Sequence, residues 1–187
     1  MAALILSGLG ACLSVDFVYR QTTIYRAVRN NNEAAVRSLL ARDPTEARRQ
    51  SPMLGITPLH IAAENGNQGI AELLLANGAD PNTVRESKLT PLQLAAFGDH
   101  VSIAELLIEH GADIDQKGWR HNDTPLQVAA THGYVDMIEL LLRHGAGRNY
   151  RDMLGKTALD MAREGGYTNA VELLMAPQTG KGIDKDS

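Results

Sequence analysis

The sequence lacks several features on which large classes of proteins depend. Its 187 residues include one cysteine, Cys12, which excludes an internal disulfide and a cysteine-based metal cluster. No apolar run reaches the roughly 18 residues that a membrane-spanning helix needs. The formal net charge of −4 excludes a chain that is basic throughout, as many nucleic-acid binders are. Because nothing demands an oxidising compartment, we expect a cytoplasmic protein.

Aromatic residues are scarce, but apolar residues as a whole are not. Phenylalanine, tyrosine and tryptophan make up 4% of the chain, whereas 44% of its residues are apolar. Leucine, alanine and isoleucine supply most of these, which favours closely packed small helices over a β-sandwich. A chain of this length and composition can bury a sizeable core.

The most informative feature of the sequence is an internal repeat. Four segments share one pattern, and their threonines lie 33, 34 and 33 residues apart. The segments are TPLHIAA at 57–63, TPLQLAA at 90–96, TPLQVAA at 124–130 and TALDMAR at 157–163. An apolar, leucine-rich run follows each of them, and a degenerate fifth unit begins upstream near Thr22.

Each unit is expected to form two short helices joined by a turn. The threonine is a good N-cap, and a proline after it falls at the first helical position, where its missing N–H costs nothing. The alanine pair lets a second helix approach closely. Gly66, Gly133 and Gly166 supply the left-handed turn between the helices, whereas one unit has its glycine a place earlier, at Gly98. Extended, hairpin-like loops are expected between the units.

This pattern resembles the ankyrin repeat, with its threonine-proline-leucine-histidine start and its glycine-alanine-aspartate near the end. The resemblance implies an all-α solenoid of about five helix-turn-helix repeats with interrepeat loops, in a domain over 22–177. The repeats lie near 22–50, 57–85, 90–118, 124–152 and 157–177, between an apolar extension at 1–21 and a polar tail, expected to be disordered, at 178–187. His60 is replaced by Gln93, Gln127 and Asp160, which puts the local turn geometry in question. The atypical first and last repeats are expected to present more polar outer faces.

No arrangement of side chains typical of catalysis occurs in the sequence. There is no glycine-rich phosphate loop, no paired-histidine metal motif and no nucleophile elbow. His60 is expected to be a structural hydrogen-bonding residue within its repeat. We therefore predict a protein that is not an enzyme, with no cofactor and no metal.

The uncharged amino-terminal segment, residues 1–15, leaves two interpretations open. The stretch LGAC at 9–12 resembles a bacterial lipoprotein cleavage box with Cys12 as the lipidated residue, which would export or anchor the protein. No lysine or arginine precedes the apolar core, however, and a signal peptide normally has one there. That absence favours an apolar extension, packed on the first repeat or disordered. Membrane association is expected only if Cys12 is lipidated.

The ankyrin resemblance implies that the loop tips and the exposed ends of the first helices form one concave strip that binds other proteins. Several positions there are apolar where a solvated loop would be polar, as at binding hot spots. The predicted partner-binding residues are Met53, Leu54, Ile56, Leu89, Phe97, Trp119, Arg120, His121, Asp123, His132, Met153, Leu154 and Lys156. Polar neighbours on the strip are Glu64, Asn65, Glu86, Ser87, Thr131 and Glu164. In the alternative, Met53, Leu54, Met153 and Leu154 fold back onto neighbouring loops.

Charge is unevenly distributed along the chain. Residues 20–50 hold seven arginines and three acidic residues, whereas the rest of the chain from Ser51 is acidic. The sequence therefore predicts a non-catalytic protein-interaction module or scaffold with a protein partner that it does not identify. The alternative is an acidic or nucleic-acid partner at the arginine-rich first repeat, although few aromatic residues interleave with the arginines.

Overall fold

The computed structural model describes residues 23–118 and 122–177, and within them the chain forms ten α-helices and no strand. Successive helices form five pairs. The pairs are α2 (Thr23–Arg29) with α3 (Glu33–Arg42), α4 (Pro58–Asn65) with α5 (Gln68–Ala76), α6 (Pro91–Phe97) with α7 (Val101–Glu109), α9 (Pro125–His132) with α10 (Val135–Arg143), and α11 (Ala158–Glu164) with α12 (Thr168–Met175). A short 3₁₀ helix, η1 (Pro44–Arg48), follows α3. The predicted all-α solenoid is confirmed.

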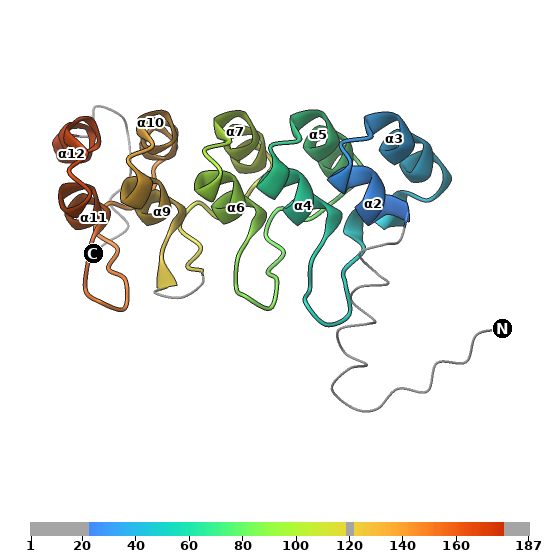
Figure 1. Cartoon of the computed structure of the whole chain (residues 1–187), viewed down its shortest axis with the longest axis horizontal. Helices are drawn as coiled ribbons and strands as arrows, with labels where there is room; N and C mark the ends of the chain where they lie inside the picture. Colours follow the sequence, from blue (N-terminus) through green and yellow to red (C-terminus); the bar gives the residue numbers. More distant parts are fainter. Residues whose placement is uncertain (1–22, 119–121, 178–187) are drawn as a thin grey trace.

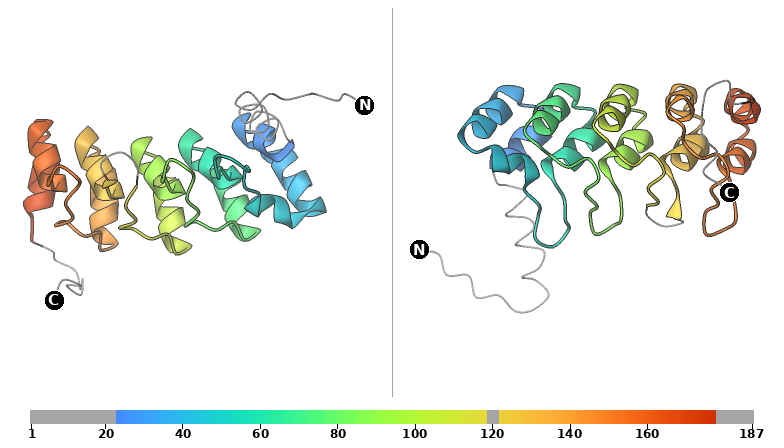
Figure 2. Two further views of the ribbon diagram at one scale, coloured as in Figure 1. Left: turned by 90° about the horizontal axis from the view of Figure 1, so that it is seen from below. Right: turned by 180° about the vertical axis from the view of Figure 1, so that it is seen from behind.

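The helices lie in two rows along the stack (Figure 1). One row holds the first helices in the order α2, α4, α6, α9 and α11, each in contact with the next, and the other holds α3, α5, α7, α10 and α12. The interrepeat segments project as loops from the row of first helices (Figures 1 and 2). Each loop is hairpin-like, because a backbone hydrogen bond closes its base. These bonds run from the N–H of Ser51 to the carbonyl of Ile56, from Arg85 to Leu89, from Gly118 to Asp123 and from Asp152 to Lys156.

A threonine begins the first helix in four of the five repeats. The hydroxyl oxygen of Thr57 accepts a hydrogen bond from the backbone N–H of His60 at 3.3 Å, and the His60 ring accepts one from the N–H of Thr57 at 3.2 Å. This reciprocal capping box satisfies donors that would otherwise be unpaired at the helix start. The same box joins Thr90 to Gln93, Thr124 to Gln127 and Thr157 to Asp160.

The turn inside a helix pair needs one residue in the left-handed conformation. Gly66, Gly133 and Gly166 supply it as predicted, with φ values of 74°, 70° and 73°. In the third repeat Gly98 has a φ of −89°, and Asp99 takes the left-handed place with a φ of 54°. The earlier glycine therefore does not displace the turn, which answers the question that the sequence left open about its local geometry. Aspartate stands at the usual place in the period, and it is among the few non-glycine residues that tolerate this conformation.

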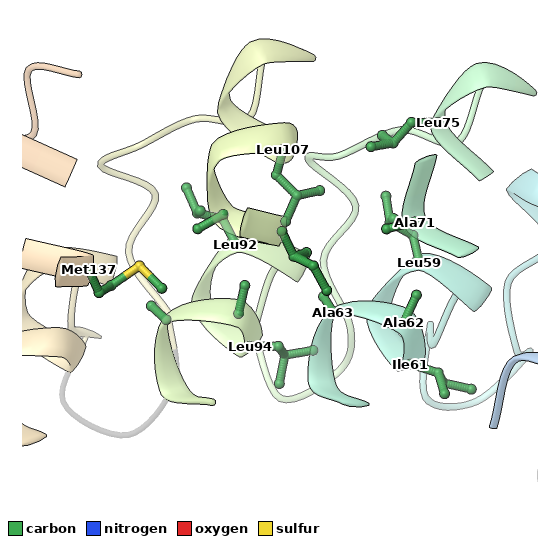
Figure 3. Close-up of a cluster of buried hydrophobic side chains, with 14 of the residues drawn as sticks. Leu59, Ile61, Ala62, Ala63, Ala71, Leu75, Leu92, Leu94, Leu107 and Met137 are labelled. Atoms are coloured by element: carbon green, nitrogen blue, oxygen red, sulfur yellow. The ribbon is translucent and has the colours of Figure 1, made fainter. Parts of the chain in front are cut away.

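Buried side chains from all five repeats form one hydrophobic cluster. Ala62 and Ala63 have no exposed surface, so the first helix of their repeat packs closely against its neighbours. Leu59 and Leu92, from successive repeats, are also fully buried. Figure 3 shows these side chains gathered between neighbouring helices. Because the repeats share their core, each one is stabilised by the next.

The third residue of the first helix also ties its repeat to the following one. His60 contacts the base of the next loop through Nε2, and the side-chain amides of Gln93 and Gln127 donate to the bases of theirs. The acceptors are the carbonyls of Leu89 for His60, of Gln116 and Asp123 for Gln93, and of Tyr150 and Lys156 for Gln127, at 2.9–3.1 Å. Replacing histidine by glutamine therefore leaves the geometry intact, because both side chains carry one acceptor and an N–H donor. Asp160, which has no donor when ionised, only caps its own helix.

The environment of His60 favours its neutral form, as expected for a structural residue. Burial, with a smaller contribution from the charge of Arg85, lowers the pKa of His60 from 6.5 to about 4. The ring nitrogen Nδ1 accepts from the N–H of Thr57, so the neutral ring carries its proton on Nε2 and donates it to Leu89. A second proton on Nδ1 would point at a donor and break the capping box.

His60 makes the stability of the stack depend on pH. Its pKa is lower in the folded chain than in the unfolded one, so its contribution is present above pH 6.5 and is lost as the pH falls towards 4. We expect this residue alone to remove about 3 kcal/mol of unfolding free energy between pH 7 and pH 4. Urea denaturation across that range measures the loss.

The matched control for this pH dependence is His60→Gln. The variant copies Gln93 and Gln127, so it should keep both hydrogen bonds without a titrating group. The wild type should therefore lose more stability than the variant below pH 6.5. Parallel pH profiles for the two proteins would show that His60 does not titrate between the folded and unfolded states as argued.

The last repeat carries partly exposed apolar residues. Leu159, Val171 and Leu173 remain partly exposed, although their counterparts one repeat earlier, Leu126, Ile138 and Leu140, have no exposed surface. Apolar residues therefore occupy the positions that a following repeat covers elsewhere in the stack. The expectation of a more polar outer face stays a prediction for this repeat.

The predicted extension at 1–21 and the tail at 178–187 lie outside the described residues, as does Cys12. The two interpretations of the amino-terminal segment therefore stay predictions. Among the helices of residues 23–118 and 122–177, none has both the length and the apolar character that a membrane crossing requires.

Candidate functional site

We call one surface of the stack the inner strip. It comprises the C-terminal ends of the first helices, at Glu64, Phe97, Thr131, His132 and Glu164, and the loop side chains of Arg85 and Lys156 that reach them. Phe97, the last residue of α6, lies at its centre and is 62% exposed. The same place in the period is held by Glu64, Thr131 and Glu164 in the neighbouring repeats. Phe97 is therefore a large apolar side chain at a position that is otherwise polar. A single exposed phenylalanine is common on a protein surface, so its neighbours decide its meaning.

Two further rings extend the apolar surface from Phe97. The ring of His132, at the end of α9, lies edge-on to Phe97 with centroids 5.1 Å apart and an interplanar angle of 73°. Tyr134 stacks on His132 at 5.2 Å with an interplanar angle of 13°. These three rings, called the aromatic row below, join the third and fourth repeats, whose helices α6 and α9 lie side by side (Figure 1).

Ion pairs flank the aromatic row on both sides. Towards the amino-terminal repeats, Arg85 lies 3.7 Å from the carboxylate of Glu64. Towards the last repeat, Lys156 lies 2.6 Å from the carboxylate of Glu164. Exposed pairs of this kind contribute little stability. An apolar centre with a charged rim is the arrangement typical of interaction surfaces.

Two carboxylates beside the aromatic row form no ion pair. Asp99 follows Phe97 by two residues, and Asp136 follows His132 by four. Burial and the neighbouring charge of Asp136 raise the pKa of Asp99, against a smaller opposite effect of the charge of His100. The described residues supply neither carboxylate with a salt bridge or a side-chain hydrogen bond.

The loop tips carry some of the predicted partner-binding residues in exposed positions. Met53 is 40% exposed, Met153 73% and Leu154 62%. For Met153 and Leu154, the alternative in which they fold back onto neighbouring loops is therefore wrong. Leu54 and Leu89 are half-buried and pack against the core. A backbone hydrogen bond joins the first two interrepeat loops: the carbonyl of Leu54 accepts from the N–H of Glu86 at 2.9 Å.

The residue directly before each threonine lies at the base of its loop and not at the tip. Ile56 is 5% exposed, and its carbonyl accepts a hydrogen bond from the hydroxyl of Tyr25 at 3.1 Å. Its place among the surface residues of the strip was a wrong prediction. Leu89, Asp123 and Lys156 occupy the equivalent place, where their carbonyls accept from the preceding repeat. Only Lys156 also reaches the inner strip, through its ammonium group.

Three predicted residues, Trp119, Arg120 and His121, lie outside the described residues. Their participation in the strip stays a prediction. Tyr134, Asp99 and Asp136, by contrast, belong to the site although sequence reasoning did not select them. The sequence feature that could have indicated this part of the site is the pair of aromatic side chains, His132 and Tyr134, around the inner turn of the fourth repeat.

A shallow hollow opens between the loops of the first three repeats. Its volume is about 470 Å³, and its lining residues are Leu54, Ile56, Arg85, Glu86 and Ser87. The hydroxyl of Ser87 accepts a hydrogen bond from Nε of Arg85 at 2.7 Å. The hollow extends the inner strip towards the loop tips and offers an apolar floor beside a guanidinium group.

Several arginines of the first repeat are already engaged within the chain. Arg37 pairs with Glu33 at 2.8 Å, Arg49 pairs with Glu46, and Arg48 donates to the carbonyl of Gly78 at 2.8 Å. These contacts use part of the positive charge that could attract an acidic partner. Arg20 lies outside the described residues.

Across residues 23–118 and 122–177, no three histidine, cysteine, aspartate or glutamate side chains lie close enough together to hold a metal ion.

Two toxins of Latrodectus tredecimguttatus are similar in sequence to short stretches of this chain. Delta-latroinsectotoxin-Lt1a is 45% identical over 56 residues, which are 30% of this chain and 4% of the toxin. Alpha-latrotoxin-Lt1a is 30% identical over 74 residues, which are 40% of this chain and 5% of the toxin. The chain thus spans only a small part of the length of these relatives.

The family model for ankyrin repeats in three copies matches residues 24–118 and again 115–187. Together these matches cover well over half of the chain. The helix pairs, the capping boxes that begin the first helices and the hairpin-like loops agree with that match. The chain belongs to the ankyrin-repeat family.

Proposed function

We propose that this chain is a non-catalytic interaction module that binds a partner protein through the inner strip and the neighbouring loop tips. Ankyrin repeats generally mediate protein–protein interaction. The observation that carries the proposal is the exposure of Phe97 at the centre of the strip, in contact with His132 and between two ion pairs. Exposed aromatic anchors with a polar rim are typical of binding hot spots.

The exposed tip of the last loop supports the same face. Met153 and Leu154 present two large apolar side chains to solvent, next to Lys156 at the base of that loop. They would add apolar contact at the edge of the site. A nucleic-acid or acidic partner at the first repeat is less well supported, because Arg37, Arg48 and Arg49 hold contacts within the chain.

Site-specific photo-crosslinking in the source cell tests the proposal. A benzoyl-phenylalanine at Phe97 should give a discrete adduct with one partner protein. The same probe at Met175, which is similarly exposed at 61% but lies at the end of α12, should not give it. Binding of the purified partner should then fall about 30-fold in Phe97→Ala, which corresponds to about 2 kcal/mol for a hot-spot truncation.

Circular dichroism of Phe97→Ala serves as the folding control, since an exposed side chain contributes little to the core. Equal adducts from Phe97 and Met175 would remove the strip from the proposal. So would an unchanged affinity of the partner for a folded Phe97→Ala protein.

A further inference from the structure

The aromatic row lies beside two carboxylates, and among the described residues the charge of His100 offsets only part of the cost of ionising Asp99. Of the carboxylates around it, Glu64 and Glu164 are paired with Arg85 and Lys156. Asp99 and Asp136 are exposed and have neither a salt bridge nor a side-chain hydrogen bond to a described residue. A partner that brings a cation to this place would compensate that charge.

The four groups concerned belong to two adjacent inner turns. Phe97 and Asp99 are separated by Gly98 at the turn of the third repeat, and Phe97 contacts His132, which begins the turn of the fourth. Asp136, in the first turn of α10, is close enough to Asp99 to raise its pKa by like-charge repulsion. The exposed ring and the two carboxylates therefore belong to the adjacent inner turns of the third and fourth repeats, which the Phe97–His132 contact joins.

An exposed ring next to carboxylates suits one kind of side chain above others. The guanidinium of arginine is planar, stacks on aromatic faces and remains charged at any pH of interest. It can also donate hydrogen bonds to carboxylates while its aliphatic stem covers apolar surface. A lysine ammonium shares the charge but cannot stack as a plane. An acidic or purely apolar side chain would leave Asp99 and Asp136 without a salt bridge.

We infer that the inner strip recognises an arginine-bearing segment of its partner, with the guanidinium stacked on Phe97 and facing Asp99 and Asp136. This inference rests on the proposed function and adds the chemistry of the partner to it. The flanking pairs Arg85–Glu64 and Lys156–Glu164 mark the ends of the site. Because the carboxylates of those pairs already have a cation, Asp99 and Asp136 are the residues that would favour a positively charged ligand.

The probe for this inference is a phage-displayed library of random dodecapeptides, selected on the full-length protein. Peptides that bind are expected to be enriched in arginine and depleted in aspartate and glutamate. One enriched peptide is then synthesised, together with versions in which its arginine is replaced by lysine or by glutamine. We expect affinity to fall several-fold with lysine and more than 10-fold with glutamine.

Variants of the protein separate the charge from the ring. Asp99→Asn with Asp136→Asn should weaken the peptide about 10-fold and flatten the salt dependence of its binding. Asparagine tolerates the left-handed conformation at residue 99, so this double variant should keep the turn. Glu172→Gln, with the same type of charge change on α12, is the matched control and should leave the affinity unchanged.

The outcomes distinguish this inference from the proposal beneath it. If Phe97→Ala abolishes peptide binding but the double asparagine variant does not weaken it, the strip binds proteins and the arginine inference fails. If peptide binding does not depend on Phe97 at all, the proposed function fails as well. Selection of acidic or uncharged peptides, or of none, overturns the arginine inference.

Discussion

Replacing Gln127 by glutamate is expected to lower the free energy of unfolding by roughly 3–5 kcal/mol at pH 7, the scale of an uncompensated buried charge. Gln127 is 1% exposed, and its amide nitrogen donates to the carbonyls of Tyr150 at 3.1 Å and Lys156 at 2.9 Å. Glutamate keeps an acceptor for the N–H of Thr124 but turns a charged oxygen towards two carbonyl oxygens. Both hydrogen bonds from the side chain to the base of the loop that leads to the fifth repeat are lost.

Chemical denaturation of three variants checks this expectation. Gln127→His follows the pattern of His60 and should retain most of the stability, because its ring can accept from Thr124 and donate to the next loop. Gln127→Ala should fall between the histidine and glutamate variants. The loss in Gln127→Glu should also shrink at low pH, where the carboxyl regains a donor. A glutamate variant as stable as the wild type would show that these hydrogen bonds do not couple the repeats.

The fold was predictable because the residues that specify it recur at one period. The threonine and the residue three places after it mark each helix start, and the alanine pairs mark the close contacts. The role of Gln93 and Gln127 was not predictable in the same way. Their acceptors are backbone carbonyls at the base of the loop that leads to the following repeat, and any residue type supplies such a carbonyl. Histidine and glutamine therefore differ in sequence and serve equally in the structure.

The geometry of the turn at Gly98 was also not predictable from the sequence. The glycine stands one place early, whereas the chain keeps the turn at its usual place in the period and uses Asp99 in the left-handed conformation. A short polar side chain can adopt that conformation at modest cost, so the backbone did not have to shift.

The candidate site was predicted in part, for a definable reason. Exposure of Phe97, Met153 and Leu154 follows from apolar residues at places where other repeats or loops are polar. Ile56 was assigned to the surface because it stands beside the loop tip in the sequence. The hairpin closes directly at that residue, and its side chain turns into the core. The neighbourhood of Phe97, Asp99 and Asp136 joins two repeats, which linear spacing alone does not reveal.

The shared core leads to a second large stability effect, which depends on position in the stack. Leu126 in the fourth repeat has no exposed surface, and Leu126→Ala should cost about 2–5 kcal/mol, as large-to-small substitutions in cores do. Leu159 holds the same place in the fifth repeat but is partly exposed. Leu159→Ala should therefore cost less than half as much.

Urea denaturation of both variants, with hydrogen exchange of α11 and α12, tests this difference. Leu126 is a buried residue of α9, on which α11 packs, so its loss should also speed exchange in α11. Leu159→Ala should leave exchange in α6 and α7 unchanged, because neither helix packs against the last repeat as its neighbour. Equal losses of stability in the two variants would mean that Leu159 is covered as completely as Leu126. The position of a leucine in the stack would then not govern its contribution.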